Sequence, residues 1–231
     1  GFACPIGALQ AVNGSRQFSF SFYVAGLLLA FGVLLGRAIC GWLCPFGLLQ
    51  ELIHKIPSPK RKLKKGFLYI KYVVLVVFVL ILPVAVTDYM GMGKPAFCQY
   101  ICPAGTLEGG LFLLAAHESL RKAIGALFSL KMAILVLTLI GCVLFYRFFC
   151  RTLCPLGAIY GLFNKISIFR LEVDHHKCVG CGKCKEVCGM EVDPVKTPDS
   201  AECIRCGACA DVCPTNAVCL GFSTKSKKNL P

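Results

Sequence analysis

Charged residues are scarce in this chain of 231 residues, where they account for 16% of the sequence against 56% hydrophobic residues. The mean hydropathy is correspondingly high, at +0.69. Soluble domains are typically about 45–50% apolar, and disordered chains are far more polar, so both classes are excluded. Secreted disulfide scaffolds also use many cysteines, but they are usually shorter than ~80 residues and less apolar. The 17 cysteines therefore predict a membrane protein that binds metal.

Nucleotide-binding motifs are absent as well. The sequence has no Walker motif, no Rossmann fingerprint after a strand and no evident flavin site, so no obvious site for NADH exists. Methionine and histidine are few, with four of each, which disfavours a copper-handling protein. No histidine lies within an apolar run, so a haem ligated by two membrane histidines is not expected. The four are His54, His117, His175 and His176.

The net charge of +13 is compatible with nucleic acid or with an anionic membrane surface. Many of the basic residues lie just beyond apolar runs, which favours the membrane. Lysine and arginine would also offset part of the negative charge of cysteine-ligated clusters. We expect membrane lipid as a partner and no nucleic acid.

Three apolar runs are long enough to cross a bilayer, which requires roughly 20 residues. They cover residues 18–36, 66–86 and 125–146. Helices in the core of a soluble protein are the alternative, but the chain has too little polar sequence to cover three of them. Segment 37–65 is strongly basic, so the positive-inside rule places it and the residues after 146 in the cytoplasm. Segment 87–124 then lies outside.

One cysteine motif, CP-x-G, recurs four times along the chain. Its cysteines are Cys4, Cys44, Cys102 and Cys154. Three copies have a second cysteine four positions earlier, namely Cys40, Cys98 and Cys150. This recurrence indicates an internal duplication. Each half reads outer motif, span, inner motif, which predicts a pseudo-two-fold repeat in an α-helical membrane domain at residues 1–170.

Thiolates are the preferred ligands of iron–sulfur clusters, and proline suits the first position of a helix. The motif therefore predicts a cysteine at a helix N-terminus, where free N–H groups favour an anionic ligand. Cys40, Cys44, Cys150 and Cys154 give four inner thiolates, enough for one [4Fe-4S] cluster. The outer cysteines are three, Cys4, Cys98 and Cys102, and we expect sequence upstream of Gly1 to supply a fourth. Zinc, transient copper, helix capping alone and a Cys98–Cys102 disulfide are the alternatives.

Two further cysteine runs follow in the polar C-terminal region. They read CVGCGKCKEVC at 178–188 and CIRCGACADVC at 203–213. This is the spacing of bacterial two-cluster ferredoxins, in which the fourth cysteine of each run ligates the other cluster. One [4Fe-4S] cluster then takes Cys178, Cys181, Cys184 and Cys213, and the other takes Cys203, Cys206, Cys209 and Cys188. We predict a small α+β ferredoxin-like domain at 171–219, held together by its clusters, and a basic tail at 220–231.

The segments CGWLCPFG and CRTLCPLG, together with the paired ferredoxin runs, resemble the membrane polyferredoxins of the NapH, NosR and CcoG types. The resemblance implies a mixed fold in the prokaryotic cytoplasmic membrane, with the ferredoxin domain in the cytoplasm. It further implies an electron-transfer subunit between a quinone or cytoplasmic donor and the other subunits of a membrane redox complex. A copper reductase or oxidase-assembly factor and a redox sensor are the alternatives. Because the hydrocarbon core is roughly 30 Å thick, transfer between inner and outer sites requires either clusters near the midplane or a quinone between the repeats.

Overall fold

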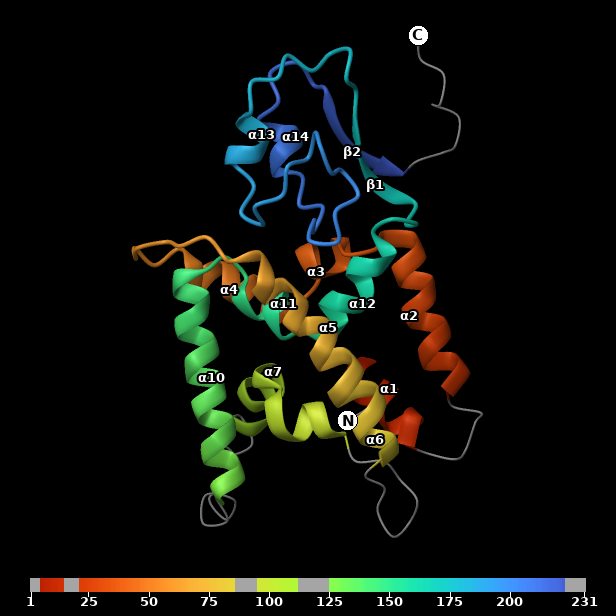
Figure 1. Cartoon of the computed structure of the whole chain (residues 1–231), viewed down its shortest axis with the longest axis vertical. Coiled ribbons are helices and arrows are strands. Elements are labelled where there is room, and N and C mark those ends of the chain that lie inside the picture. Colours follow the sequence, from red (N-terminus) through yellow and green to blue (C-terminus); the bar gives the residue numbers. More distant parts are fainter. Residues whose placement is uncertain (1–4, 15–20, 86–94, 112–124, 223–231) are drawn as a thin grey trace. The chain divides into compact units, whose positions relative to one another are not determined.

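The computed structural model describes residues 5–14, 21–85, 95–111 and 125–222. Most of these residues are helical, and a single pair of strands is formed among them (Figure 1). The chain divides into two compact units. The first unit comprises residues 1–26 and 49–155, and the second comprises residues 27–48 and 156–231.

Two helices of the first unit are long and apolar enough to cross a membrane, Gly66–Ala85 and Ala126–Leu144 (α10). They coincide with two of the predicted runs. Much of their apolar surface is exposed, as at Val73 and Leu137, which are 59% and 69% exposed. Burying such side chains in lipid removes this surface from water, so the helices support a location in the membrane.

The helix Gly66–Ala85 is not uniform along its length. Its successive segments are a 3₁₀ turn η1 (Lys65–Tyr69), α5 (Ile70–Val74), a π-helical stretch η2 (Leu75–Ile81) and α6 (Leu82–Ala85). Pro83 lies in the last segment and has no N–H to donate to the preceding turn. The helical register therefore changes along this span without interrupting it.

The remaining helices of the first unit are short. They are α1 (Pro5–Gly14), η3 (Phe97–Ile101), α7 (Pro103–Gly105), η4 (Thr106–Leu111) and α11 (Phe148–Thr152). Helix α1 packs against η2, α6 and η3, while η3, α7, η4 and α11 contact α10. Segments that carry CP-x-G motifs thus pack directly on the two long helices of this unit.

The predicted span at 18–36 corresponds to helix α2 (Ser21–Leu35), most of which belongs to the second unit. Its 15 residues reach about 22 Å at 1.5 Å per residue, less than the thickness of a hydrocarbon core. Residues 15–20 lie outside the described part of the chain. The third span and the pseudo-two-fold repeat therefore stay predictions. Helix α2 ends at Leu35. The next residue is Gly36, whose φ of +58° suits glycine, and α3 (Ala38–Trp42) follows.

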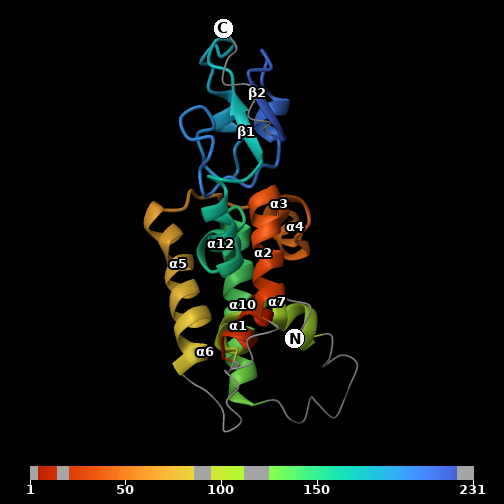
Figure 2. The same cartoon turned by 90° about the vertical axis from the view of Figure 1, so that its right-hand side faces the viewer.

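The C-terminal part of the second unit contains the predicted ferredoxin-like fold. Strands β1 (Phe169–Val173) and β2 (Val218–Phe222) pair antiparallel, with Leu171 opposite Leu220 (Figure 2). The two cysteine runs lie between these strands, with single helical turns α13 (Lys183–Glu186) and α14 (Ala208–Asp211). The observed elements agree with the predicted small α+β fold. The compact unit is larger than residues 171–219, because it includes α3, most of α2, and α12 (Pro155–Phe163) after Pro155.

Candidate metal centres

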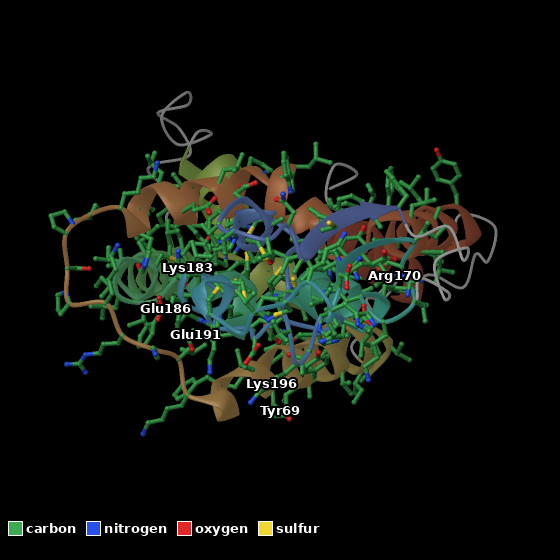
Figure 3. The ribbon with its side chains drawn as sticks, turned by 90° about the horizontal axis from the view of Figure 1, so that it is seen from above. Tyr69, Arg170, Lys183, Glu186, Glu191 and Lys196 are labelled. Atoms are coloured by element: carbon green, nitrogen blue, oxygen red, sulfur yellow. The ribbon has the colours of Figure 1, made fainter. Side chains whose placement is uncertain are left out.

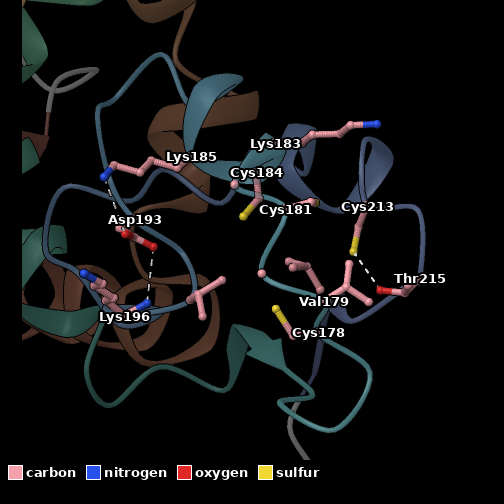
Figure 4. A pocket seen from close by; sticks show the side chains of 14 residues that line it. Cys178, Val179, Cys181, Lys183, Cys184, Lys185, Asp193, Lys196, Cys213 and Thr215 are labelled. Atoms are coloured by element: carbon pink, nitrogen blue, oxygen red, sulfur yellow. Dashed lines mark hydrogen bonds and ion pairs between the residues drawn. The ribbon is translucent and has the colours of Figure 1, made fainter.

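The structure brings four predicted ligands of one cluster around a single cavity of about 240 Å³ (Figure 4). Three come from the first cysteine run and one from the end of the second run. They are Cys178, Cys181, Cys184 and Cys213. The backbone between the first three turns at Gly180 and Gly182, whose φ angles of +69° and +77° favour glycine. Local turn geometry therefore directs separate segments of the chain toward one space.

This arrangement suits a cluster better than a single ion. Among the residues described, no group of three or more His, Cys, Asp or Glu side chains is close enough together to hold one metal ion. In a [4Fe-4S] cluster each cysteine binds a different iron, so the ligands must surround a volume and not converge on a point. Four thiols around a cavity provide that geometry, and thiolates are the ligands such clusters use.

The backbone around Cys213 favours its thiolate form. Desolvation is the largest single influence and raises the pKa of this thiol, but hydrogen bonds from the backbone N–H groups of Val218, Thr215 and Ala217 and from the Thr215 hydroxyl together lower it below its usual value. The N–H of Ala217 donates to the sulfur at 3.3 Å, and the Thr215 hydroxyl lies 3.8 Å from it. Because the thiolate is the metal-binding form, these donors prepare Cys213 as a ligand.

The four cysteines predicted for the other cluster interact electrostatically with one another. They are Cys188, Cys203, Cys206 and Cys209. Burial raises the pKa of Cys209 to about 12, and the charges of the other three thiols raise it as well. Burial also raises the pKa of Cys203, with contributions from Cys188 and Cys206. Bound iron would reverse this effect, because its positive charge favours the thiolate form of its ligands.

A hydrogen-bonded junction joins the loop of Cys203 to the helices of the CP-x-G region within the second unit. The side-chain amide of Asn164, directly after α12, donates to the carbonyls of Cys203 at 2.7 Å and Ser200 at 2.9 Å. Its side-chain oxygen accepts the Arg37 N–H at 3.0 Å. One side chain thereby links the start of α3, the end of α12 and a predicted cluster ligand.

Arg37 and Trp42 extend the same junction. The fully buried Arg37 side chain donates to the carbonyl of Ala201 at 2.5 Å and pairs with Glu202 at 2.9 Å. The Trp42 indole N–H donates to the carbonyl of Arg205 at 3.2 Å. Arg205 is itself buried and donates to the carbonyl of Asn164 at 2.6 Å. Sequence patterns did not predict these residues, because a single arginine or asparagine has no signature until its distant partner is known.

Two glycines allow the close approach at this junction. A Cβ at Gly41 would lie 2.6 Å from the carbonyl oxygen of Ile204, and one at Gly161 would lie 2.9 Å from that of Ala201. Real Cβ atoms do not approach a carbonyl so closely, so any larger residue would displace the loop. Gly41 lies next to Cys40, which places the Cys203 loop against the helix that carries Cys40.

The prolines of the CP-x-G motifs begin helices, as predicted. Helices α1, α4 (Pro45–His54), α7 and α12 start at Pro5, Pro45, Pro103 and Pro155. Cys102 caps α7, and its sulfur accepts the N–H of Gly105 at 3.4 Å. This is the predicted role of a helix N-terminus, where free N–H groups meet an anionic ligand.

The inner cysteines divide between the two units. Cys40 is buried in α3 and Cys44 precedes α4, whereas Cys150 is buried in α11 and Cys154 precedes α12. The first pair belongs to the second unit and the other pair to the first unit. The shared inner cluster stays a prediction.

For the outer motifs, Cys98 lies in η3 and Cys102 follows it. Cys4 lies outside the described residues. No disulfide joins any cysteines within the described ranges, so the alternative Cys98–Cys102 bond is not formed in this structure.

Family models of iron–sulfur proteins match several stretches of the chain. A family model described as a 4Fe-4S binding domain matches residues 1–21, 17–64, 72–121 and 126–173. Each match contains one CP-x-G motif. A second 4Fe-4S binding domain matches residues 197–219, which include the second ferredoxin run. The chain belongs to the 4Fe-4S membrane polyferredoxins. The resemblance seen in its motifs is confirmed.

Named relatives cover most of the chain. It is 31% identical over 215 residues to an uncharacterized protein of Methanocaldococcus jannaschii, covering 89% of this chain and 72% of that protein. It is 26% identical to the methylamine utilization ferredoxin-type protein MauN of Methylorubrum extorquens, covering 80% of this chain and 59% of MauN. For the ferredoxin-type protein NapH of Haemophilus influenzae, identity is 28%, covering 70% of this chain and 50% of NapH. No solved structure matches significantly.

These findings establish the general chemistry. The polyferredoxin binds [4Fe-4S] clusters through its cysteine-rich domains, and its ferredoxin-type relatives support an iron–sulfur electron-transfer role. Its two long apolar helices indicate a membrane protein.

Proposed function

We propose that this polyferredoxin is a membrane subunit that relays electrons between a quinone or cytoplasmic donor and a partner oxidoreductase across the membrane. The observation that carries the proposal is the junction between the Cys203 loop and the helices around Cys40. There the Asn164 amide donates to the carbonyl of Cys203 at 2.7 Å, and Trp42 donates to Arg205. A soluble electron carrier has no need for such a fixed connection to a membrane domain.

The ligand assignment follows the cysteine geometry. The two clusters of the ferredoxin-like domain are called the tail clusters. The first tail cluster would use the four cysteines around the cavity, Cys178, Cys181, Cys184 and Cys213. The second would use the electrostatically coupled set, Cys203, Cys206, Cys209 and Cys188. In the membrane domain, Cys40, Cys44, Cys150 and Cys154 would hold a third cluster, and Cys4, Cys98 and Cys102 would contribute to a fourth.

The junction also orders the relay. Carbonyl groups in residues 200–205 accept the hydrogen bonds from Arg37, Asn164 and Trp42. This segment contains Cys203, a ligand of the second tail cluster. The second tail cluster would therefore exchange electrons with the inner CP-x-G site. The first tail cluster would face the soluble or peripheral partner. Its cavity is bordered by exposed lysines, of which Lys183 and Lys196 are labelled in Figure 3.

The bound clusters would supply one-electron transfer, and the protein's own groups would hold and tune them. The N–H donors at Cys213 stabilise thiolate, and the Lys185–Asp193 pair at 3.9 Å lies beside the same cavity. Basic residues in segment 37–65 place the ferredoxin domain in the cytoplasm by the positive-inside rule. A quinone between the membrane motifs would bridge a gap too long for one electron hop.

The test of the ligand assignment is Cys206→Ser, with Cys219→Ser as its matched control. Both thiols are exposed, but only Cys206 is assigned to a cluster. After anaerobic purification, Cys206→Ser is expected to lose or convert one cluster, measured as iron, acid-labile sulfide and EPR signal, while the control keeps wild-type values. Zinc in place of iron, or equal losses in both variants, contradicts the assignment.

A further inference from the structure

A buried glutamine of helix α4 contacts Cys150. Gln50 lies six residues after Cys44 in its motif and is fully buried. Its side-chain N–H donates to the Cys150 sulfur at 3.1 Å, and its side-chain oxygen accepts the N–H of Phe149 at 3.1 Å. The backbone bond orients the amide, so that its nitrogen faces the thiol of the next residue.

The outer motif repeats half of this arrangement. Gln10 lies six residues after Cys4 and is also fully buried. Its side-chain oxygen accepts the N–H of Phe97 at 3.2 Å, and Phe97 precedes Cys98 as Phe149 precedes Cys150. Among the residues that the structure describes, however, its side-chain nitrogen has no hydrogen-bond partner. A buried N–H without an acceptor costs free energy, so this amide nitrogen can donate to an acceptor at the outer motif.

We propose that the glutamine six residues after the cysteine of a CP-x-G motif is a positioning residue. Its side-chain N–H donates to a thiolate of another motif copy, namely to the cysteine four positions before that copy's own CP-x-G cysteine. Gln50 serves Cys150, and Gln10 serves Cys98 when Cys98 is bound to its cluster. The inference rests on the proposed function, because it assigns clusters to these motifs.

The physical effect is on the reduction potential. A cluster gains negative charge when it accepts an electron, and an N–H···S bond stabilises that added charge. Each glutamine therefore makes its cluster easier to reduce. At the same position after Cys154 the chain has Tyr160, another buried side chain with a polar hydrogen. The sixth residue after the CP-x-G cysteine is thus a hydrogen-bond donor in three of the four motif copies. The exception is Glu108.

The experiment compares Gln50→Leu and Gln10→Leu with Cys142→Ala in the full chain. Cys142 is buried beside Gln50 and its sulfur donates to the glutamine oxygen at 3.5 Å, so its loss perturbs the same packing and leaves the N–H donor to Cys150 in place. Redox-titrated EPR and iron counting are performed on anaerobically purified protein. The leucine variants are expected to shift one midpoint potential each to a more negative value, with iron content unchanged, whereas Cys142→Ala stays at the wild-type potential.

A second measurement does not depend on the variants folding. In wild-type protein labelled with ¹⁵N-glutamine, pulsed EPR is expected to detect a ¹⁵N coupling at a membrane-domain cluster, together with a proton that exchanges in D₂O. The inference is overturned if the leucine variants keep the wild-type midpoint potentials with intact iron, or if no ¹⁵N coupling is detected. Either result would not contradict the proposed electron relay. Wild-type protein with only the two tail clusters overturns the assignment of clusters to the membrane motifs.

Discussion

At the scale of single residues, buried charges hold the Cys203 loop. The Arg37 side chain is fully buried, and its partner Glu202 is only 14% exposed. Both charges have lost most of their hydration, so the ion pair compensates part of the desolvation cost of each. The pair is consequently a sensitive point of the junction, although it contains no cluster ligand.

Arg37→Met is expected to destabilise the second unit by about 3–5 kcal/mol, because it removes an ion-pair partner from the largely desolvated Glu202 carboxylate. The double variant Arg37→Met/Glu202→Met should recover a large part of this loss, since it removes both charges. Both effects are measured by unfolding the purified protein in urea, with the absorbance of the clusters as the signal. A double variant as unstable as the single one would show that the carboxylate is not the cause.

The residue scale also separates what sequence patterns predict from what they cannot. Proline after cysteine predicted helix starts at Pro5, Pro45, Pro103 and Pro155, because a helix N-terminus depends on neighbouring residues alone. Ligand grouping around the cavity was also predictable from ferredoxin spacing. The roles of Arg37, Asn164 and Gln50 could not be predicted from the sequence, because their hydrogen-bond partners lie 164, 127 and 100 positions away.

At the scale of elements, the contact between α3 and the Cys203 loop depends on an absent side chain. A Cβ at Gly41 would lie 2.6 Å from the carbonyl oxygen of Ile204. A backbone carbonyl cannot move aside as a flexible side chain can. If Gly41 is replaced by a larger residue, either α3 or the loop therefore has to move. The spacing between Cys40 and the second tail cluster is therefore tied to this glycine.

Gly41→Ala is expected to lower the free energy of unfolding by about 1–3 kcal/mol, the usual cost of overpacking. It should also slow electron transfer between the tail clusters and the membrane clusters. Freeze-quench EPR measures the rate of this transfer. Gly26→Ala is the matched control, because a Cβ there meets nothing within 4 Å. Equal behaviour of the two variants would contradict a close contact at Gly41.

Element lengths were less predictable than element identities. The apolar run at 18–36 predicted a span, but helix α2 as described begins at Ser21 and has 15 residues. The run at 66–86 predicted a helix and forms one, yet with a π-helical stretch at 75–81 that apolar periodicity does not encode. Hydropathy reports how apolar a segment is and not which hydrogen-bond register its backbone adopts.

At the scale of the whole molecule, the two kinds of domain differ in what stabilises them. Helix α10 has 19 residues and forms its own backbone hydrogen bonds. The ferredoxin-like part has helices of four residues and strands of five, so it has little regular structure of its own. Its stability must come largely from the bound clusters.

Removal of iron by an anaerobic chelator is therefore expected to unfold residues 171–219 and to spare residues 126–144. Hydrogen exchange followed by mass spectrometry compares the two segments in one sample: protection of the first should fall to the level of an unfolded chain, while the second stays protected. Retained protection in both segments after complete loss of iron would show that the ferredoxin part folds without its clusters.

The orientation of the molecule in the membrane can be read from one native cysteine. Cys219 is exposed on β2 and is assigned to no cluster, whereas Cys142 is buried. The positive-inside rule predicts that the ferredoxin-like domain faces the cytoplasm. A membrane-impermeant maleimide should therefore label Cys219 in inverted vesicles and leave it unlabelled in right-side-out vesicles, with anaerobic conditions keeping the cluster cysteines occupied. Cys219→Ser should abolish the label in inverted vesicles, which assigns the signal to this residue. Labelling from the outside instead would reverse the proposed topology, and with it the side from which the tail clusters meet their partner.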